Sequence, residues 1–283
     1  MKREAVKWKE EAQQQLSTQL IDDLPAPQRR TLRRIVNGGA SGWLTVLPLR
    51  EEGYDLSATQ FRDQLAIRYH REPTGLPAHC DGCGALFYLQ HGLDCLKGGL
   101  VKRGHNDLRD SDAKLADIAW SGVSVEPILV PENDRQNRQM LQADWMARGV
   151  WEGSRVAFFD NRIIDADAPS YVQANLSWEA IANRAASAKK AKYCSAAEEL
   201  RASFTPLVCS TDGVLHCEYA AYQKRLACRL ANKWQKPFSI IMARVRVRTQ
   251  FAIFRSVDLR LRGTRRQICG LDLHDGAAIG VGY

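Results

Sequence analysis

The first half of the chain alternates helical patterns with prolines and glycines. Apolar residues at helical spacing predict helices over residues 2–21, 28–36 and 57–69. Pro25 ends the first pattern, Gly38 ends the second, and Ser57 supplies a capping side chain for the third. Cysteines and glycines then gather within residues 80–99, which predicts a loop-rich module.

The second half combines helical and strand patterns. A helix is predicted over residues 106–120, followed by three strands over residues 124–130, 142–148 and 155–164. A long helix over residues 176–200 leads to an apolar stretch at 204–209, and basic helices follow. The pattern indicates an α/β (α+β) protein with a mixed core and flanking helices.

A length of 283 residues allows about two domains at roughly 150 residues each. We expect four regions: a helical linker region at 1–75, a cysteine-rich knuckle at 76–102, an α/β core at 103–215 and a basic helical C-terminal segment at 216–283. The sequence contains no internal repeat.

Composition favours a globular protein without a membrane span. Hydrophobic residues make up 45% of the chain, charged residues 25%, and the mean hydropathy is −0.35. No apolar run approaches the roughly 18 residues of a spanning helix. The charged start at residues 1–11 lacks the apolar stretch of a signal peptide. We therefore expect an intracellular protein with reduced cysteines and no membrane partner.

The net charge of +8 is concentrated near the C-terminus. Residues 223–266 hold thirteen Lys or Arg and a single acid, Asp258, so this segment carries +12 and the rest of the chain −4. Arg244, Arg246 and Arg248, at every second position, are the arginines of this segment that we expect to contact nucleic acid. Such polarity is typical of a polyanion binder, because Lys and Arg release counterions from phosphates. The alternative is a solvated helix face.

Three cysteines and a histidine have the spacing of a metal site. Cys80, Cys83, His91 and Cys95 follow the pattern Cys-x2-Cys-x7-His-x3-Cys. Thiolate and imidazole suit tetrahedral zinc, and four protein ligands predict a structural site, since a catalytic zinc keeps one position open. His79 is an alternative fourth ligand, although it directly precedes Cys80.

Two aspartates are predicted to face each other on a hairpin. Residues 142–164 indicate two strands with a turn at 151–154, and residue 152 lies midway between Asp144 and Asp160. An odd-length turn would place both carboxylates on one face, where they repel and attract a divalent cation such as Mg²⁺ or Mn²⁺. The alternative is a pair of surface aspartates. Phe158 and Phe159 argue against it, because apolar surroundings are unfavourable for an unpartnered carboxylate.

A helix downstream carries cations on one face. Lys189, Lys192 and Tyr193 stand at positions i, i+3 and i+4 of the predicted helix. Lys189 is a candidate catalytic group for phosphodiester hydrolysis, with Lys192 and Tyr193 in support. The alternative is a solvated lysine stripe, which the helix dipole also favours near a C-terminus.

The order of these motifs resembles the C-terminal part of non-LTR retrotransposon proteins that carry a restriction-like endonuclease. The likeness spans residues 41–266 and rests on the cysteine cluster, Arg103-Gly-His-Asn106, Ala143-Asp144, Asp160 and the lysine–tyrosine helix. It implies a zinc knuckle and a PD-(D/E)XK core that nicks target DNA with Mg²⁺ or Mn²⁺ to prime reverse transcription.

The resemblance also implies residue roles. Asp144 and Asp160 match the metal-binding acids and Lys189 the catalytic lysine. Arg103, His105 and Asn106 match an element expected either to contact DNA or to hold the zinc knuckle against the core. Two residues depart from the family pattern: Ala143 stands in place of a proline, and Gly104 separates Arg103 from His105. The implied partners are a target DNA duplex and element RNA, met in the nucleus.

Three hypotheses follow for function. The first is a metal-dependent DNA endonuclease domain, with the basic segment on the DNA backbone. The second is a non-catalytic, zinc-stabilised nucleic-acid-binding fragment of a degenerate retroelement polyprotein. The third is a partner-binding scaffold without a role in nucleic-acid binding. The sequence has no Tyr-x-Asp-Asp polymerase motif, so no polymerase active site is expected in this chain.

Overall fold

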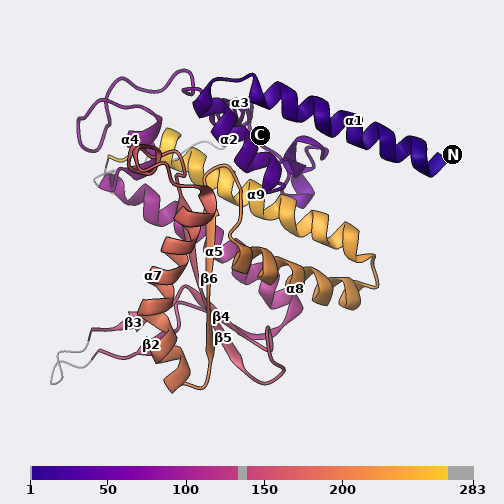
Figure 1. Cartoon of the computed structure of the whole chain (residues 1–283). Helices are drawn as coiled ribbons and strands as arrows, with labels where there is room; N and C mark the ends of the chain where they lie inside the picture. Colours follow the sequence, from indigo (N-terminus) through magenta and orange to yellow (C-terminus); the bar gives the residue numbers. More distant parts are fainter. Residues whose placement is uncertain (1, 133–138, 267–283) are drawn as a thin grey trace, which may run out of the picture.

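The computed structural model describes residues 2–132 and 139–266 and shows a mixed α/β protein (Figure 1). Its helices are α1 (Lys2–Asp22), α2 (Ala26–Asn37), α3 (Ala58–Arg68), α4 (Leu89–Asp94), α5 (Leu100–Ala119), α6 (Pro169–Gln173), α7 (Trp178–Glu199), α8 (Cys217–Trp234) and α9 (Phe238–Arg262). Short 3-10 turns are η1 (Gly42–Leu44), η2 (Arg50–Glu52) and η3 (Lys97–Gly99). The strands are β1 (Ser121–Val125), β2 (Ile128–Val130), β3 (Leu141–Gln142), β4 (Trp145–Arg148), β5 (Val156–Ile164) and β6 (Ser203–Ser210). The end of the expected C-terminal segment, residues 267–283, lies outside the described residues.

The central sheet has four strands in the order β1-β4-β5-β6. Strands β1, β4 and β5 are antiparallel neighbours, whereas β5 and β6 run parallel. A parallel pair needs a crossover connection, and α7 occupies it. Strands β2 and β3 form a separate antiparallel pair beside this sheet.

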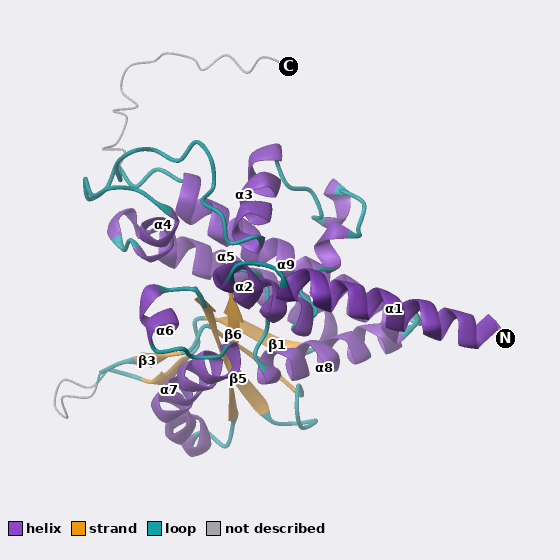
Figure 2. Cartoon of the chain, turned by 45° about the horizontal axis from the view of Figure 1, so that its top comes forward, coloured by secondary structure: helices purple, strands orange, loops and turns teal. Residues whose placement is uncertain are grey.

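Helices cover both faces of the sheet (Figure 2). On one face, Trp145 and Phe159 join a large core with Leu108 of α5, Tyr222 of α8 and Phe254 of α9. The basic C-terminal helices α8 and α9 therefore contribute to the same hydrophobic core as the sheet.

The opposite face of the sheet packs against α7. Phe158 of β5 and Phe204 of β6 form a second cluster with Tyr193 and Ala196. Alternate residues of β5 thus point to different layers, as the period of a strand requires. This alternation determines which β5 side chains meet α7.

Local side chains explain where several helices begin. The Ser57 side chain accepts from Gln60 N while the Gln60 side chain accepts from Ser57 N, which forms a capping box at α3. The Ser177 hydroxyl accepts from Ala180 N at the start of α7. None of the helices in the described ranges is long and apolar enough to cross a membrane.

The predicted helix over 106–120 begins six residues too late. Gly98 and Gly99 have φ values of 71° and 70°, so the chain turns there and α5 starts at Leu100. Arg103 and His105, which precede the predicted helix, are consequently helical residues, like Asn106.

Two predicted strands are each divided in the structure. Glu126 has a φ of 55° and interrupts the predicted strand over 124–130 between β1 and β2. The predicted strand over 142–148 is also divided, because β3 ends at Gln142 and β4 begins at Trp145. Glu126 N donates to Asp144 O and Ala143 N donates to Pro127 O, so the two breaks lie side by side. Asp144 therefore occupies a kink between two short strands.

Candidate functional site

The four expected zinc ligands converge. The ligating atoms of Cys80, Cys83, His91 and Cys95 all lie within 4.8 Å of one another. Cys80 Sγ and Cys83 Sγ each lie 3.9 Å from Cys95 Sγ, and Cys83 Sγ lies 3.4 Å from His91 Nε2. Sulfurs around a tetrahedral zinc at about 2.3 Å are separated by about 3.8 Å. The Cys3His cluster can therefore hold a zinc ion. His79 is not part of this cluster: its side chain is exposed, and its backbone forms a β-bridge with Leu86.

The surroundings of Cys80 favour its thiolate, whereas desolvation and hydrogen bonds with Cys80 and Cys95 raise the pKa of Cys83. Burial raises the pKa of Cys80, but hydrogen bonds from His91 and from the backbone outweigh it and lower the pKa to about 6. Metal ligation requires the thiolate form.

The cluster is attached to the end of α9. Asp81 accepts hydrogen bonds from Thr264 Oγ1 at 2.7 Å and from Arg265 N at 2.9 Å, which hold the pKa of Asp81 below its usual range. Arg265 is buried and donates to Gly92 O at 2.9 Å. The cysteine-rich module thus docks on the helical layer through polar contacts.

The two candidate metal-binding acids lie close enough to interact electrostatically. Trp145 pairs with Phe159 and Met146 with Phe158, so the hairpin keeps the predicted register as far as Trp145. Asp144 N donates to Phe159 O, and Asn161 N donates to Asp144 Oδ2 at 2.6 Å. Asp160 faces α7, whereas Asp144 lies just before β4 and its carboxylate contacts His105 of α5.

Asp160 meets the cationic face of α7. Lys189 Nζ lies 2.6 Å from Asp160 Oδ1, and the Asp160 side chain is only 4% exposed. Burial and the negative charge of Asp144 raise the pKa of Asp160, although Lys189 and Tyr193 oppose this shift. A buried carboxylate beside a second one favours a cation close by.

Tyr193 anchors α7 beside the acids. Its hydroxyl donates to Gln142 O at 3.1 Å and its ring stacks on Phe204 with centroids 4.7 Å apart. Burial and the charge of Asp160 raise the pKa of Tyr193, so the phenol stays protonated. Lys192 Nζ lies 4.9 Å from the ring centroid of Tyr193 on the exposed side of the helix.

His105 of α5 touches the acid pair from another element. Its Nε2 lies 2.9 Å from Asp144 Oδ1, and its side chain is 26% exposed. An ionised carboxylate only accepts, so Nε2 carries the hydrogen when Asp144 is charged. His105 is thus a partner of a candidate metal ligand, whereas the sequence assigned it to DNA contact or to holding the zinc knuckle.

Close packing explains why residue 104 is a glycine. A Cβ at Gly104 would lie 2.4 Å from Ser256 Oγ and 3.0 Å from Ser256 O. The glycine that separates Arg103 from His105 therefore allows α5 and α9 to cross closely. Arg103 is exposed and Asn106 half-buried on the same helix.

A buried polar network lies behind Asp144, and sequence reasoning missed it. Asn161 Nδ2 donates to Asp112 Oδ2 at 2.7 Å, and the Tyr219 hydroxyl donates to the same oxygen at 2.6 Å. Trp145 Nε1 donates to Asn161 Oδ1 at 3.1 Å. Burial is the main reason that the pKa of Asp112 rises to about 7. Asp112 lies two helical turns after His105 on α5, a spacing that could have indicated a shared face.

The basic segment is used partly for internal contacts. Arg244 pairs with Glu52, Arg255 with Asp55 and Arg262 with Asp63. Arg260 and Arg265 are buried. A substantial part of its positive charge therefore ties α9 to the preceding loops.

The three expected DNA-contacting arginines of α9 do not share a face. Arg244, Arg246 and Arg248 are all exposed. Residues two apart on a helix point about 200° apart, so Arg246 lies on a different side from Arg244 and Arg248. A single straight DNA backbone along one helix face would not meet all three.

Comparisons with known proteins give no assignment. No protein-family model matches the chain, and no curated protein matches it significantly. The candidate site is therefore defined by its residues alone: a Cys3His cluster, an acid pair and a lysine helix.

Proposed function

We propose that this chain is a metal-dependent DNA endonuclease domain of the non-LTR retrotransposon type, with a PD-(D/E)XK core. The observation that carries the proposal is the ion pair of Lys189 with buried Asp160, close to Asp144, which lies just before β4 and accepts from Asn161 N. A mixed sheet with helices on both faces is compatible with the expected core. Cleavage of target DNA is the activity that this set of side chains supports best.

Asp144 and Asp160 would hold the Mg²⁺ or Mn²⁺ ion. Their carboxylate oxygens are the hard donors that these ions prefer. The raised pKa of buried Asp160, caused by burial and by the charge of Asp144, indicates a site that a cation would stabilise. The bound ion would supply Lewis-acid polarisation of a phosphoryl oxygen and activation of water.

The protein side chains would orient the reacting groups. Lys189 directs an ammonium to Asp160 Oδ1, where it can stabilise charge that develops on the phosphate. Tyr193 holds α7 against β3 through Gln142 O, and His105 orients Asp144 through Oδ1. The Cys3His cluster has a structural role at the start of α5.

The test is nicking of supercoiled plasmid DNA in the presence of Mg²⁺ or Mn²⁺. Asp144→Ala should reduce nicking to background, and Lys189→Gln should reduce it about a hundredfold or more. Asp117→Asn, which changes an exposed acid of α5, is the control and should retain activity. Unchanged nicking by Asp144→Ala would refute the assignment.

The same experiment separates the alternatives. Salt-sensitive DNA or RNA binding without cleavage would support a zinc-stabilised nucleic-acid-binding fragment. Polyanion affinity that is unaffected when Arg244, Arg246 and Arg248 are neutralised would support a partner-binding scaffold.

A further inference from the structure

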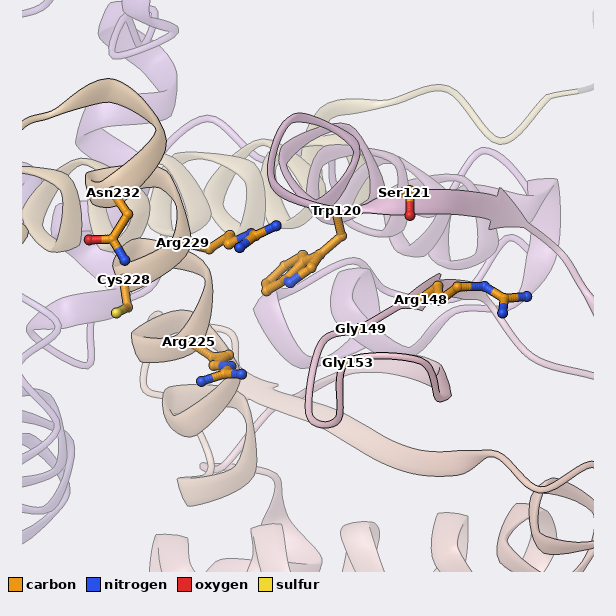
Figure 3. A pocket seen from close by; sticks show the side chains of 9 residues that line it. All are labelled: Trp120, Ser121, Arg148, Gly149, Gly153, Arg225, Cys228, Arg229 and Asn232. Carbon is orange, nitrogen blue, oxygen red and sulfur yellow. The ribbon is translucent and has the colours of Figure 1, made fainter.

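A small pocket lies between α8 and the β4–β5 hairpin, at the opposite end of β4 from Asp144 (Figure 3). Its volume is about 310 Å³, near the lower end of the roughly 300–1,000 Å³ range of ligand sites. The residues that give it chemical character are Trp120, Arg148, Arg225, Cys228 and Arg229.

The pocket is positively charged. None of the residues that line it is acidic, and Arg148, Arg225 and Arg229 are all exposed. In Figure 3, Arg229 extends from α8 toward the Trp120 ring, whereas Arg148 points away from it. Arg225 and Arg229 are therefore the two cations best placed to meet an anion beside Trp120.

Backbone contacts hold both arginines in place. Arg225 Nε donates to Val150 O at 2.8 Å, and Arg229 Nε donates to Ala119 O at 3.2 Å. These bonds use Nε, so the terminal Nη groups remain as donors for a ligand. Guanidinium groups fixed in this way match the geometry of a phosphate.

Trp120 supplies a rigid aromatic surface. Its ring packs toward Tyr222 with centroids 6.0 Å apart, and the side chain is half-buried. The ring also lines the pocket, so part of it remains accessible to a ligand. An indole of this kind can stack on a nucleobase irrespective of base identity.

We propose that this pocket binds a nucleoside phosphate unit, with the base against Trp120 and the phosphate on Arg225 and Arg229. An inorganic anion would make no use of the indole, and an apolar ligand would make no use of the arginines. The unit can be a free nucleotide or one residue of a single strand. The inference is independent of the proposed nuclease activity, because it shares no residue with the acid pair.

Cys228 allows a direct test. It is exposed and lines the pocket on α8, whereas exposed Cys217 lies at the start of that helix and lines a different pocket. The whole protein would be alkylated in the presence of AMP, inorganic phosphate, a single-stranded oligonucleotide or a duplex. Peptide-resolved mass spectrometry would then measure the rate at which each of the two thiols reacts. We expect AMP to protect Cys228 and not Cys217, and to do so at lower concentration than phosphate.

The same titration identifies the source of the ligand. If the oligonucleotide protects Cys228 at a lower concentration, counted in nucleotides, than AMP does, the ligand is a strand of nucleic acid. If AMP protects at the lower concentration, the ligand is a free nucleotide. Protection should persist in Asp144→Ala, which separates this site from nicking. Equal protection of Cys217 and Cys228, or none with any probe at millimolar concentration, would overturn the proposal.

Substitutions of the pocket residues provide a second test, in which the protection of Cys228 is measured again. Trp120→Leu and the double variant Arg225→Gln/Arg229→Gln should each weaken protection about tenfold or more. Gly153→Leu should block the pocket without removing either arginine contact, since a Cβ there meets no atom within 4 Å. Arg184→Gln on α7 is the control and should bind normally. Full protection in Gly153→Leu would contradict the assignment.

Discussion

His105 Nε2 lies 2.9 Å from Asp144 Oδ1 and joins helix α5 to the kink before β4. Helix α5 begins five residues after Cys95, the last ligand of the Cys3His cluster. The candidate zinc module and the acid pair are therefore connected by one helix and one hydrogen bond.

This contact predicts that His105 positions Asp144 for metal binding. The prediction depends on the proposed nuclease activity. His105→Ala should raise the Mg²⁺ or Mn²⁺ concentration needed for half-maximal nicking about tenfold or more, because Asp144 loses a donor that orients it. His105→Gln retains an N–H donor and should recover part of the loss. Metal titrations of the nicking rate measure the effect, with the exposed Asp107→Asn as control. A change in maximal rate with no change in metal dependence would contradict this role.

Zinc removal should loosen the cysteine-rich module first. We expect one zinc per chain by elemental analysis, and a chelator should lower the Tm by about 5 °C or more because ligand binding stabilises the folded state. Hydrogen exchange should accelerate within residues 76–99. Cys95→Ser should reproduce the effect, whereas Cys217→Ser, outside the cluster, should not. Unaltered exchange after zinc loss would rule out a structural site.

Asp112 predicts a pH-dependent stability. Its folded-state pKa of about 7 exceeds the usual value of about 3.9, so the folded state binds the proton more tightly. Its contribution to the free energy of unfolding is therefore greatest below about pH 4 and declines by about 1.4 kcal/mol per pH unit up to about pH 7. Asp112→Asn should remove this decline.

Denaturant unfolding from pH 4 to pH 8 measures the effect as the difference between wild type and Asp112→Asn. The asparagine side chain of this variant keeps an oxygen that can accept from Tyr219 and Asn161, so the network should survive the change. Asp117→Asn is the exposed control and should keep the wild-type slope. Identical slopes in wild type and Asp112→Asn would contradict the prediction.

The close crossing of α5 and α9 depends on Gly104. Gly104→Val should reduce the free energy of unfolding by about 1–3 kcal/mol, because its side chain would overlap Ser256. Gly153→Ala provides the control, since a Cβ there meets no atom within 4 Å. Chemical denaturation measures both. Equal stability of Gly104→Val and the wild type would show that the helices can separate without loss.

The sequence by itself determined the features that depend on short-range pattern. Strand β5 and helix α7 lie within two residues of their predicted ends, because each has the hydrophobic period of its element. The hairpin register also follows from local spacing, since a turn centred on residue 152 pairs Arg148 with Val156 and Trp145 with Phe159. The same holds for the Cys3His cluster, whose ligands lie within sixteen residues.

Only the tertiary structure decided the contacts between distant segments. The ion pair between Lys189 and Asp160, the bond from His105 to Asp144 and the network around Asp112 join different elements. Periodicity shows which face of an element is apolar, but packing decides which element covers it. Packing likewise directed several arginines of the basic segment to internal partners, which net charge could not indicate.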